Sequence, residues 1–266
     1  MIQTLYDGDR FSLLHGESLE ALRLLPDKSV DMICTDPPYS KHVHAKLGKE
    51  KRNDGVLPRK MLTFPSLDEA RIKLFAAEYV RVCKGWILTF SDFYNSAFWG
   101  EGVQAAGGEW VRTGQWVKTN PMPQITGDRP ACGGEDIVIC HASARTADWE
   151  WNAHGHAAIW RGGRDPHQIH PNQKPEWLIQ ALLGQFAPAN ALVLDPFIGT
   201  GTTAVAAMRT TRVTGEMDPM TTCKACARKK VEEYAPPLPV GVRVLGIEGD
   251  IMVATGAVER VTGVCF

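Results

Sequence analysis

The sequence predicts an α/β fold with a parallel or mixed β-sheet that is covered by helices on both faces. The first observation is that short apolar strand patterns alternate with amphipathic helix patterns along most of the 266 residues. The second is the composition, 44% hydrophobic and 22% charged, which excludes a disordered, collagen-like or coiled-coil chain. The third is that no apolar run approaches the ~18 residues that a membrane span needs. We therefore expect a large globular domain without a membrane as partner.

Each element follows from hydrophobic periodicity and from the residues that start or stop it. Two prolines end the strand at 30–35, because proline neither donates a ladder hydrogen bond nor continues a helix. The capping-box sequence Ser66-Leu-Asp-Glu69 opens a helix that Gly85 ends. In chain order we expect strand 11–15, helix 18–25, strand 30–35, helix 66–84, strand 86–90, a helical stretch to 107, strand 111–117, strand 136–140, helix 175–186, strand 191–194, helix 201–208, strand 212–216 and helix 219–234.

Some stretches interrupt this alternation. Residues 142–172 are aromatic, rich in His and Arg, and aperiodic, and residues 40–60 have no clear period. After residue 236 the sequence changes to alternating Val and Gly, which we interpret as an added hairpin. The expected organisation is a main domain over 1–234, insertions at about 40–62 and 119–172, and an extension of unknown role at 235–266.

Residues 192–204 have the pattern of a buried strand, a glycine-rich turn and the start of a helix. Glycines let the backbone approach a ligand closely, and a helix start offers free N–H groups to an anion. As a bare string, Gly199-x-Gly201-x-x-Ala204 also fits the dinucleotide fingerprint, with Glu216 ending the next strand to hold ribose hydroxyls. An ordinary tight turn between strand and helix would give the same string.

Asp195 discriminates between two cofactors at this turn. A carboxylate at the end of the strand would repel the pyrophosphate of NAD if it pointed into the site. It suits S-adenosylmethionine, which carries an ammonium group and no phosphate. Asp195 on the ammonium, the turn on the carboxylate and Glu216 on the ribose form a consistent set. The charges therefore favour S-adenosylmethionine over NAD.

Asp36-Pro37-Pro38-Tyr39 directly follows a strand, at the edge where open α/β sheets bind ligands. An exocyclic amine of a nucleobase is a poor nucleophile, because its lone pair is delocalised into the ring. Acceptors at the Asp36 carboxylate and the Pro37 carbonyl would draw the amine toward tetrahedral geometry. Tyr39 would stack on the base, a contact worth about 1–3 kcal/mol, and the base would have to be extruded from a duplex. Taken alone, the tetrapeptide also fits a proline-stiffened surface turn.

Together these motifs resemble those of the DNA amino-methyltransferases, which modify adenine N6 or cytosine N4. The family's (D/N/S)PP(Y/F) tetrapeptide corresponds to residues 36–39, its FxGxG loop to 197–201 and its HPxQKP segment to 170–175. The order, with the tetrapeptide first, is similar to the β group of the family. The resemblance covers residues 10–234. It implies a Rossmann-like S-adenosylmethionine-dependent methyltransferase fold with a mixed seven-stranded sheet and small target-recognition insertions.

The resemblance also implies roles for individual residues. The implied catalytic residues are Asp36, Pro37, Pro38 and Tyr39. The implied cofactor-binding residues are Asp195, Phe197, Gly199, Gly201, Thr202, Thr203 and Glu216, with Lys174 as a further candidate. Where the family often has Gly-Asp to contact the adenine of the cofactor, this chain departs from the pattern with Gly16-Glu17, and Glu17 is the candidate there.

The implied reaction is site-specific methyl transfer from S-adenosylmethionine to double-stranded DNA, as in restriction-modification systems. In the family an Asp in the tetrapeptide goes mostly with adenine, so Asp36 favours adenine N6 over cytosine N4, although a carboxylate accepts from either amine. Methyl transfer to RNA or to a protein side-chain amide remains an alternative. So does a non-catalytic DNA-binding protein on the same fold.

The net charge of −1 averages over unequal segments. Residues 41–60 hold seven basic and two acidic residues directly after the tetrapeptide, which indicates contact with DNA phosphates, with a solvated loop as the alternative. The basic residues are Lys41, Lys46, Lys49, Lys51, Arg52, Arg59 and Lys60. A second candidate is 119–172, where arginines and the flanking Lys118 are interleaved with tryptophans.

The cysteines and histidines predict no metal site. The CxxC at 223–226 has no second CxxC, and the histidines between 154 and 170 lack the spacing of a zinc site. The N-terminus has no basic-then-apolar signal peptide, so we expect reduced thiols and a cytoplasmic protein. A homodimer is implied only by the resemblance, because a chain of this length has little surface to encircle a duplex.

Overall fold

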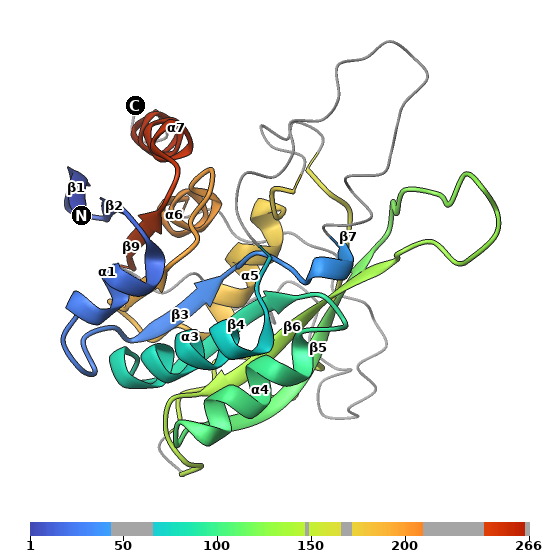
Figure 1. Ribbon diagram of the computed structural model, residues 1–266, viewed down its shortest axis with the longest axis horizontal. Helices are drawn as coiled ribbons and strands as arrows, with labels where there is room; N and C mark the ends of the chain where they lie inside the picture. Colours follow the sequence, from blue (N-terminus) through green and yellow to red (C-terminus); the bar gives the residue numbers. More distant parts are fainter. Residues whose placement is uncertain (44–65, 147–148, 166–171, 210–241, 264–266) are drawn as a thin grey trace.

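The computed structural model describes residues 1–43, 66–146, 149–165, 172–209 and 242–263. Within these residues the chain forms one mixed sheet of nine strands, in the order β1-β2-β9-β8-β3-β4-β6-β5-β7 (Figure 1). The strands are β1 (Gln3–Asp7), β2 (Phe11–His15), β3 (Met32–Thr35), β4 (Trp86–Ser91), β5 (Glu109–Lys118), β6 (Gly134–His141), β7 (Ile159–Gly162), β8 (Leu192–Asp195) and β9 (Arg243–Glu248). The predicted α/β class with a mixed sheet is therefore confirmed.

The described residues form nine strands rather than the expected seven. Six of the predicted strands are present and the one predicted at 212–216 lies outside the described residues, so β1 and β7 at the two edges and β9 inside the sheet are additional. At one edge β1 pairs antiparallel with β2, and at the other β7 pairs parallel with β5. β1 is exposed or half-buried along its whole length, and β7 lies inside the aperiodic stretch 142–172. Edge strands of this kind bury few side chains, so they carry little of the hydrophobic period that predicts a strand.

Helices cover both faces, as the sequence predicts (Figure 1). One face carries α1 (Ser18–Leu24), α3 (Glu69–Val82) and α4 (Ser96–Ala105), and the other α5 (Glu176–Phe186), α6 (Thr202–Met208) and α7 (Ile251–Thr262). Each face has its own apolar core, with Ile72 and Trp99 in the first and Leu182 and Val205 in the second. No helix in the described part of the chain has both the length and the hydrophobicity to cross a bilayer.

Helix α3 starts two residues later than the predicted capping box implies. Its N-cap is Asp68, whose carboxylate Oδ1 accepts a hydrogen bond from the Arg71 backbone N–H at 3.0 Å. Ser66 is therefore not the cap. Aspartate caps a helix as well as serine does, and its negative charge also interacts favourably with the helix dipole.

The C-terminal segment is not the added hairpin that its Val/Gly alternation suggested. β9 lies inside the sheet between β2 and β8 and is parallel to both. Gly246 lets the glycine turn pack directly on this strand, because a Cβ there would lie 2.4 Å from Ile198 Cδ1. The strand predicted at 212–216 lies outside the described residues. Alternating apolar residues predicted a strand correctly, but they did not reveal its neighbours.

The strand order reverses between β3 and β8, which lie side by side and parallel. From β3 the chain continues through α3 to β4 on one side, whereas β8 is followed by α6 and then by β9 on the other. Open α/β sheets bind ligands at the carboxyl ends of the strands next to such a reversal. Asp36, directly after β3, and Asp195, the last residue of β8, lie at this point.

Candidate active site

The Asp36-Pro37-Pro38-Tyr39 turn leaves β3 in the middle of the sheet. Pro37 is buried, and the next residue, Ser40, donates its backbone N–H to Asp92 Oδ2 at 2.6 Å. Asp92 directly follows β4, the neighbouring strand. The turn is therefore held at its start by the β3 ladder and at its end by the strand beside it.

Asp36 has one carboxylate oxygen in an ion pair and one without a partner. Oδ2 accepts from Lys174 Nζ at 2.5 Å. Oδ1 is buried and has no hydrogen-bond donor among the described residues. Burial raises the pKa of Asp36, Lys174 and the nearby Tyr39 hydroxyl oppose that shift, and Glu135 adds to it. A buried acceptor without a donor costs free energy, so this oxygen is suited to receive an N–H from a ligand.

Glu135, at the start of β6, joins several groups of this site. Its Oε2 accepts from the Tyr39 hydroxyl at 2.9 Å and lies 3.2 Å from Lys174 Nζ. Its Oε1 accepts from Lys118 Nζ at 2.5 Å. Burial alone would raise the pKa of Glu135, but Lys174, Lys118 and the Tyr39 hydroxyl lower it to about 2. No motif pointed to Glu135, and the available signal was an acidic residue directly before the predicted strand 136–140.

Lys118 belongs to this network, although the sequence placed it with the second candidate DNA surface. Its side chain is buried, with Nζ on Glu135 and 4.9 Å from the centre of the Trp116 ring. Trp160 is also buried, and Trp149 stacks on His141 with ring centroids 4.0 Å apart. The exposed part of this region is the 119–133 loop between β5 and β6, which projects beyond the sheet (Figure 1).

Asp195 is almost fully buried and links the two central strands. Its Oδ1 accepts from the Thr35 hydroxyl at 2.8 Å and from the Phe197 backbone N–H at 3.2 Å, and its Oδ2 accepts from the Thr203 hydroxyl at 2.6 Å. These three donors are neutral, and burial raises the pKa of Asp195 to about 6. Because Thr35 immediately precedes Asp36, this hydrogen bond brings the two predicted motifs together.

The glycine turn adopts the backbone that its two glycines allow. Gly199 and Gly201 have φ of +52° and +79°, in the left-handed region that favours glycine. Gly201 also packs closely on α7, since a Cβ there would lie 3.1 Å from Val261 Cγ2. Thr202 Oγ1 accepts from Arg260 of α7 at 3.0 Å, and the Phe197 ring contacts Phe75 with centroids 5.2 Å apart. Helices on both faces therefore support the turn.

Glu248 is an acidic residue of this site that the sequence motifs did not indicate. It ends β9, where its Oε2 accepts from the Gly199 backbone N–H at 3.0 Å, and burial raises its pKa. The sequence assigned this place, at the end of the strand that follows α6, to Glu216, which lies outside the described residues. The signal for Glu248 was a repeated pattern, because Arg-Val-x-Gly shortly precedes a glutamate both at 212–216 and at 243–248.

Glu17 is the N-cap of α1 and lies at the same edge of the sheet. Its Oε2 accepts from the Glu20 backbone N–H at 2.8 Å, and its Oε1 pairs with Arg71 at 2.7 Å. The next residue, Ser18, donates its hydroxyl to the Pro196 carbonyl at 2.7 Å. The start of α1 is therefore joined to the glycine turn, while both oxygens of Glu17 have partners within the chain.

One of the seven basic residues expected to contact DNA is described. Lys41 is exposed and directly follows Ser40, whose backbone N–H holds the end of the Asp36–Tyr39 turn. The other six lie outside the described residues: Lys46, Lys49, Lys51, Arg52, Arg59 and Lys60. His170 and Pro171 of the predicted 170–175 segment also lie outside them.

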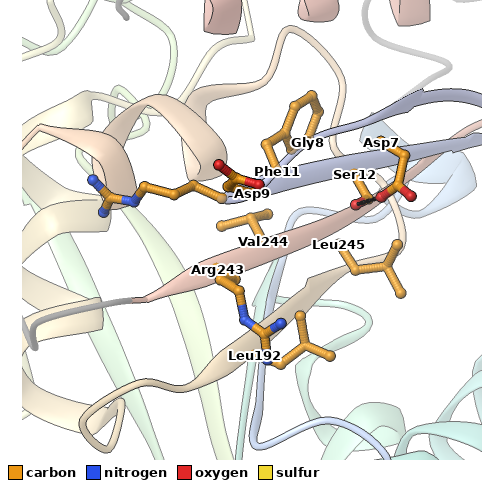
Figure 2. A pocket seen from close by; sticks show the side chains of 10 residues that line it. Asp7, Gly8, Asp9, Phe11, Ser12, Leu192, Arg243, Val244 and Leu245 are labelled. Carbon is orange, nitrogen blue, oxygen red and sulfur yellow. Dashed lines mark hydrogen bonds between the residues drawn. The ribbon is translucent and has the colours of Figure 1, made fainter.

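A hollow of about 430 Å³ lies at the opposite end of the sheet (Figure 2). It is lined by the turn between β1 and β2, including Asp7 and Asp9, and by Leu192 and Arg243 at the starts of β8 and β9. These are the amino ends of the parallel strands, whereas Asp36 and Asp195 lie at the carboxyl ends. The hollow is therefore separate from the candidate active site.

Comparison with known proteins gives a family and a fold. A model of the family described as DNA methylase matches residues 30–250. The chain is 26% identical over 225 residues to the type II methyltransferase M.HinfI of Haemophilus influenzae, covering 74% of this chain and 61% of that protein. It thus spans about three fifths of the length of M.HinfI. It is 24% identical over 255 residues to the type II methyltransferase M2.DpnII of Streptococcus pneumoniae, covering 87% and 93%.

Several solved structures share the fold. The PvuII DNA methyltransferase, described as cytosine-N4-specific, superposes with a TM-score of 0.64 at 12% identity, covering 98% of this chain and 93% of that one. The complex of M1.HpyAVI with SAM gives 0.60 at 19% identity, covering 94% and 99%. TTHA0409 of Thermus thermophilus, complexed with S-adenosyl-L-methionine, gives 0.58 at 18% identity, covering 97% and 94%. These likenesses confirm the predicted methyltransferase fold.

Proposed function

The chain belongs to the DNA methylase family, and from this premise we propose that it transfers a methyl group from S-adenosylmethionine to the N6 amine of an adenine extruded from duplex DNA. The observation that carries the proposal is the buried Oδ1 of Asp36, which has no donor among the described residues. It lies at the carboxyl end of β3, beside the glycine turn. An exocyclic amine provides the N–H that this oxygen can accept.

The residues beside the glycine turn fit S-adenosylmethionine. Asp195 is a buried carboxylate whose three hydrogen-bond donors are neutral, so a cationic ligand group would offset the cost of its burial. We assign it to the ammonium, and Glu248 to the ribose hydroxyls. Gly199 and Gly201 allow close approach to the backbone. Phe197, Thr202 and Thr203 shape the turn, and Glu17 is a further candidate on the α1 side.

Asp36 and its neighbours supply the acceptor and the orientation for methyl transfer. When bound, S-adenosylmethionine would supply a methyl group on a positively charged sulfur; the sulfur–methyl bond would break on transfer, with the neutral thioether as leaving group. Asp36 Oδ1 and the Pro37 carbonyl accept the two N–H groups of the amine, which frees its lone pair from the ring. Tyr39 stacks on the base. As the nitrogen–carbon bond forms, nitrogen gains positive charge, and the Asp36 carboxylate stabilises that charge and accepts the departing proton.

Cytosine N4 is the second candidate target, because a carboxylate accepts hydrogen bonds from either amine. The nucleosides of DNA from a host that expresses this chain distinguish the two by mass spectrometry. We expect N6-methyladenine, and sequencing of the modified bases gives the recognition site as well. If N4-methylcytosine alone were found, the target base would be cytosine rather than adenine. Methyl groups confined to RNA would contradict the proposed function.

The proposed DNA surface combines the segment that follows the catalytic turn with the loop between β5 and β6. Lys41 and the basic residues of 46–60 follow that turn in the sequence and are assigned to phosphates. The exposed 119–133 loop carries Met122, Ile125 and Arg129 and is assigned to the bases. A homodimer, which the resemblance implies, would add a second copy of this surface.

Replacing Glu248 by glutamine is expected to raise the Kd for S-adenosylmethionine about tenfold or more. Hydrogen bonds to a charged group contribute roughly 1.5–3 kcal/mol, and about 1.4 kcal/mol corresponds to a factor of ten. The matched variant Glu216→Gln is expected to change the Kd less than about threefold. Calorimetric titration of both variants compares them directly. A larger increase in this Kd for Glu216→Gln than for Glu248→Gln would assign the ribose contact to Glu216 instead.

Binding of S-adenosylmethionine is expected to weaken as the pH falls through about 6, the pKa to which burial raises Asp195. The ligand ammonium stabilises the ionised carboxylate, so affinity is full above that pKa and declines up to about tenfold per pH unit below it. Titrations between pH 5 and pH 7 measure this slope. Asp195→Asn should bind weakly and without the slope. A wild-type Kd that is constant over this range would show that Asp195 does not bind the ammonium group.

A further inference from the structure

Charged groups from distant parts of the chain meet beside the catalytic turn, and only Asp36 and Lys174 belong to motifs. The others are Glu135 and Lys118, whose side chains are 17% and 4% exposed. A buried charge is costly unless it is paired and hydrogen-bonded. Glu135 meets this condition with two ammonium groups and the Tyr39 hydroxyl. The structure therefore keeps Glu135 ionised at this place.

The Lys174 ammonium is paired with two carboxylates, those of Asp36 and Glu135. Lys174 Nζ lies 2.5 Å from Asp36 Oδ2 and 3.2 Å from Glu135 Oε2. An ammonium group has three donors, and without Glu135 it would be free to move across both oxygens of Asp36. Glu135 thus holds Lys174 on Oδ2, and Oδ1 stays available to a ligand.

The same oxygen of Glu135 also sets the position of Tyr39. Oε2 accepts from the Tyr39 hydroxyl at 2.9 Å, which restrains the rotation of the ring. Lys174 Nζ lies 5.2 Å from the centre of that ring and 5.1 Å from that of Phe90. A single atom therefore orients both the acceptor and the aromatic face of the catalytic turn.

We propose that Glu135 is a positioning residue for methyl transfer, an inference that rests on the proposed function. It holds Lys174 away from the free oxygen of Asp36 and holds the Tyr39 ring in place for the extruded base. In this role Glu135 acts through its contacts with Lys174 and Tyr39. Displacements of about 1 Å at such a site cost on the order of a hundredfold in rate.

The test measures transfer of a radiolabelled methyl group from S-adenosylmethionine to unmethylated plasmid DNA. Glu135→Gln is expected to lower kcat about 10–100-fold, while the KM for DNA and the Kd for S-adenosylmethionine stay within about threefold. Glu135→Asp keeps the charge and is expected to stay within about fivefold of wild type. Wild-type activity is measured first, because a wild-type chain that methylates no DNA rejects the proposed function rather than the role of Glu135.

Glu69→Gln is the matched control. Glu69→Gln removes a carboxylate from an exposed pair with Lys73 and should change nothing. A folded Glu135→Gln with wild-type kcat would overturn the inference. If Glu135→Gln does not fold, Tyr39→Phe replaces it, with an expected loss of about tenfold in kcat and wild-type kcat as the contrary result.

Discussion

Replacing Asp36 by alanine is expected to lower kcat for DNA methylation by about a thousandfold, with the Kd for S-adenosylmethionine within about threefold of wild type. The variant loses the acceptor that orients the amine and the carboxylate that stabilises its developing charge, and groups of this kind contribute about 10²–10⁴ in rate. Cofactor affinity persists because the proposed cofactor contacts are made by the glycine turn, Asp195 and Glu248. Single-turnover methyl transfer and calorimetry measure the two quantities separately.

The fold is expected to survive this substitution, because Lys174 keeps Glu135 as a partner at 3.2 Å. Asp36→Asn retains an acceptor oxygen without the charge, so its rate should lie between those of wild type and Asp36→Ala. Asp27→Ala removes an exposed carboxylate that pairs with Arg81 and serves as the control with unchanged rate. Wild-type methylation by Asp36→Ala would show that the mechanism is wrong.

Lys174→Met is expected to cost about 3–5 kcal/mol of unfolding free energy, because it removes one partner of a buried ion pair. It leaves Asp36 next to Glu135 with no ammonium between them, so the pKa of Asp36, already raised by burial, rises further. A protonated Asp36 has no charge to stabilise the amine. We expect kcat near pH 7 to fall about 10–100-fold.

The two effects of Lys174→Met depend on pH in opposite directions. Raising the pH ionises Asp36 and restores part of kcat. It also lowers stability, since an acid whose pKa is higher in the folded than in the unfolded state favours folding only while it is protonated. Denaturant unfolding and kcat between pH 6 and pH 9 measure both trends. Lys73→Met, which breaks an exposed pair with Glu69, should leave the unfolding free energy close to that of wild type. Parallel trends in kcat and stability would contradict this account.

The elements with strong local signals were predictable from the sequence. β3 ends where two prolines follow it, and β8 and α6 flank a glycine turn, so both motifs were assigned to the ends of the correct strands. β1 and β7 were missed, because exposed edge strands carry little hydrophobic period. β9 was predicted only as part of a hairpin, because its partners β2 and β8 are distant in sequence.

The candidate site was predictable where it lies within contiguous motifs. Asp36, Tyr39 and Asp195 belong to strings whose chemistry is apparent from the residues themselves. Glu135 and Glu248 reach the site only through strand pairing, since β6 runs beside β4 and β9 beside β8. Pairing between strands depends on the packing of the whole sheet, and a single sequence contains no local signal for it.

The ion pair between Lys118 and Glu135 also defines a boundary for protein engineering. The two residues stand on either side of the 119–133 loop, one at the end of β5 and the other at the start of β6. Lengthening a loop between closed ends costs little free energy, about 0.6 kcal/mol per doubling. We therefore expect that the mostly exposed residues 121–132 can be replaced, whereas Thr119 and Asn120 hold Gly162 and Arg164 through hydrogen bonds. On the proposed contact of this loop with the bases, grafted loops of other lengths and sequences are expected to redirect methylation to new DNA sites, while the groups around Asp36 stay in place.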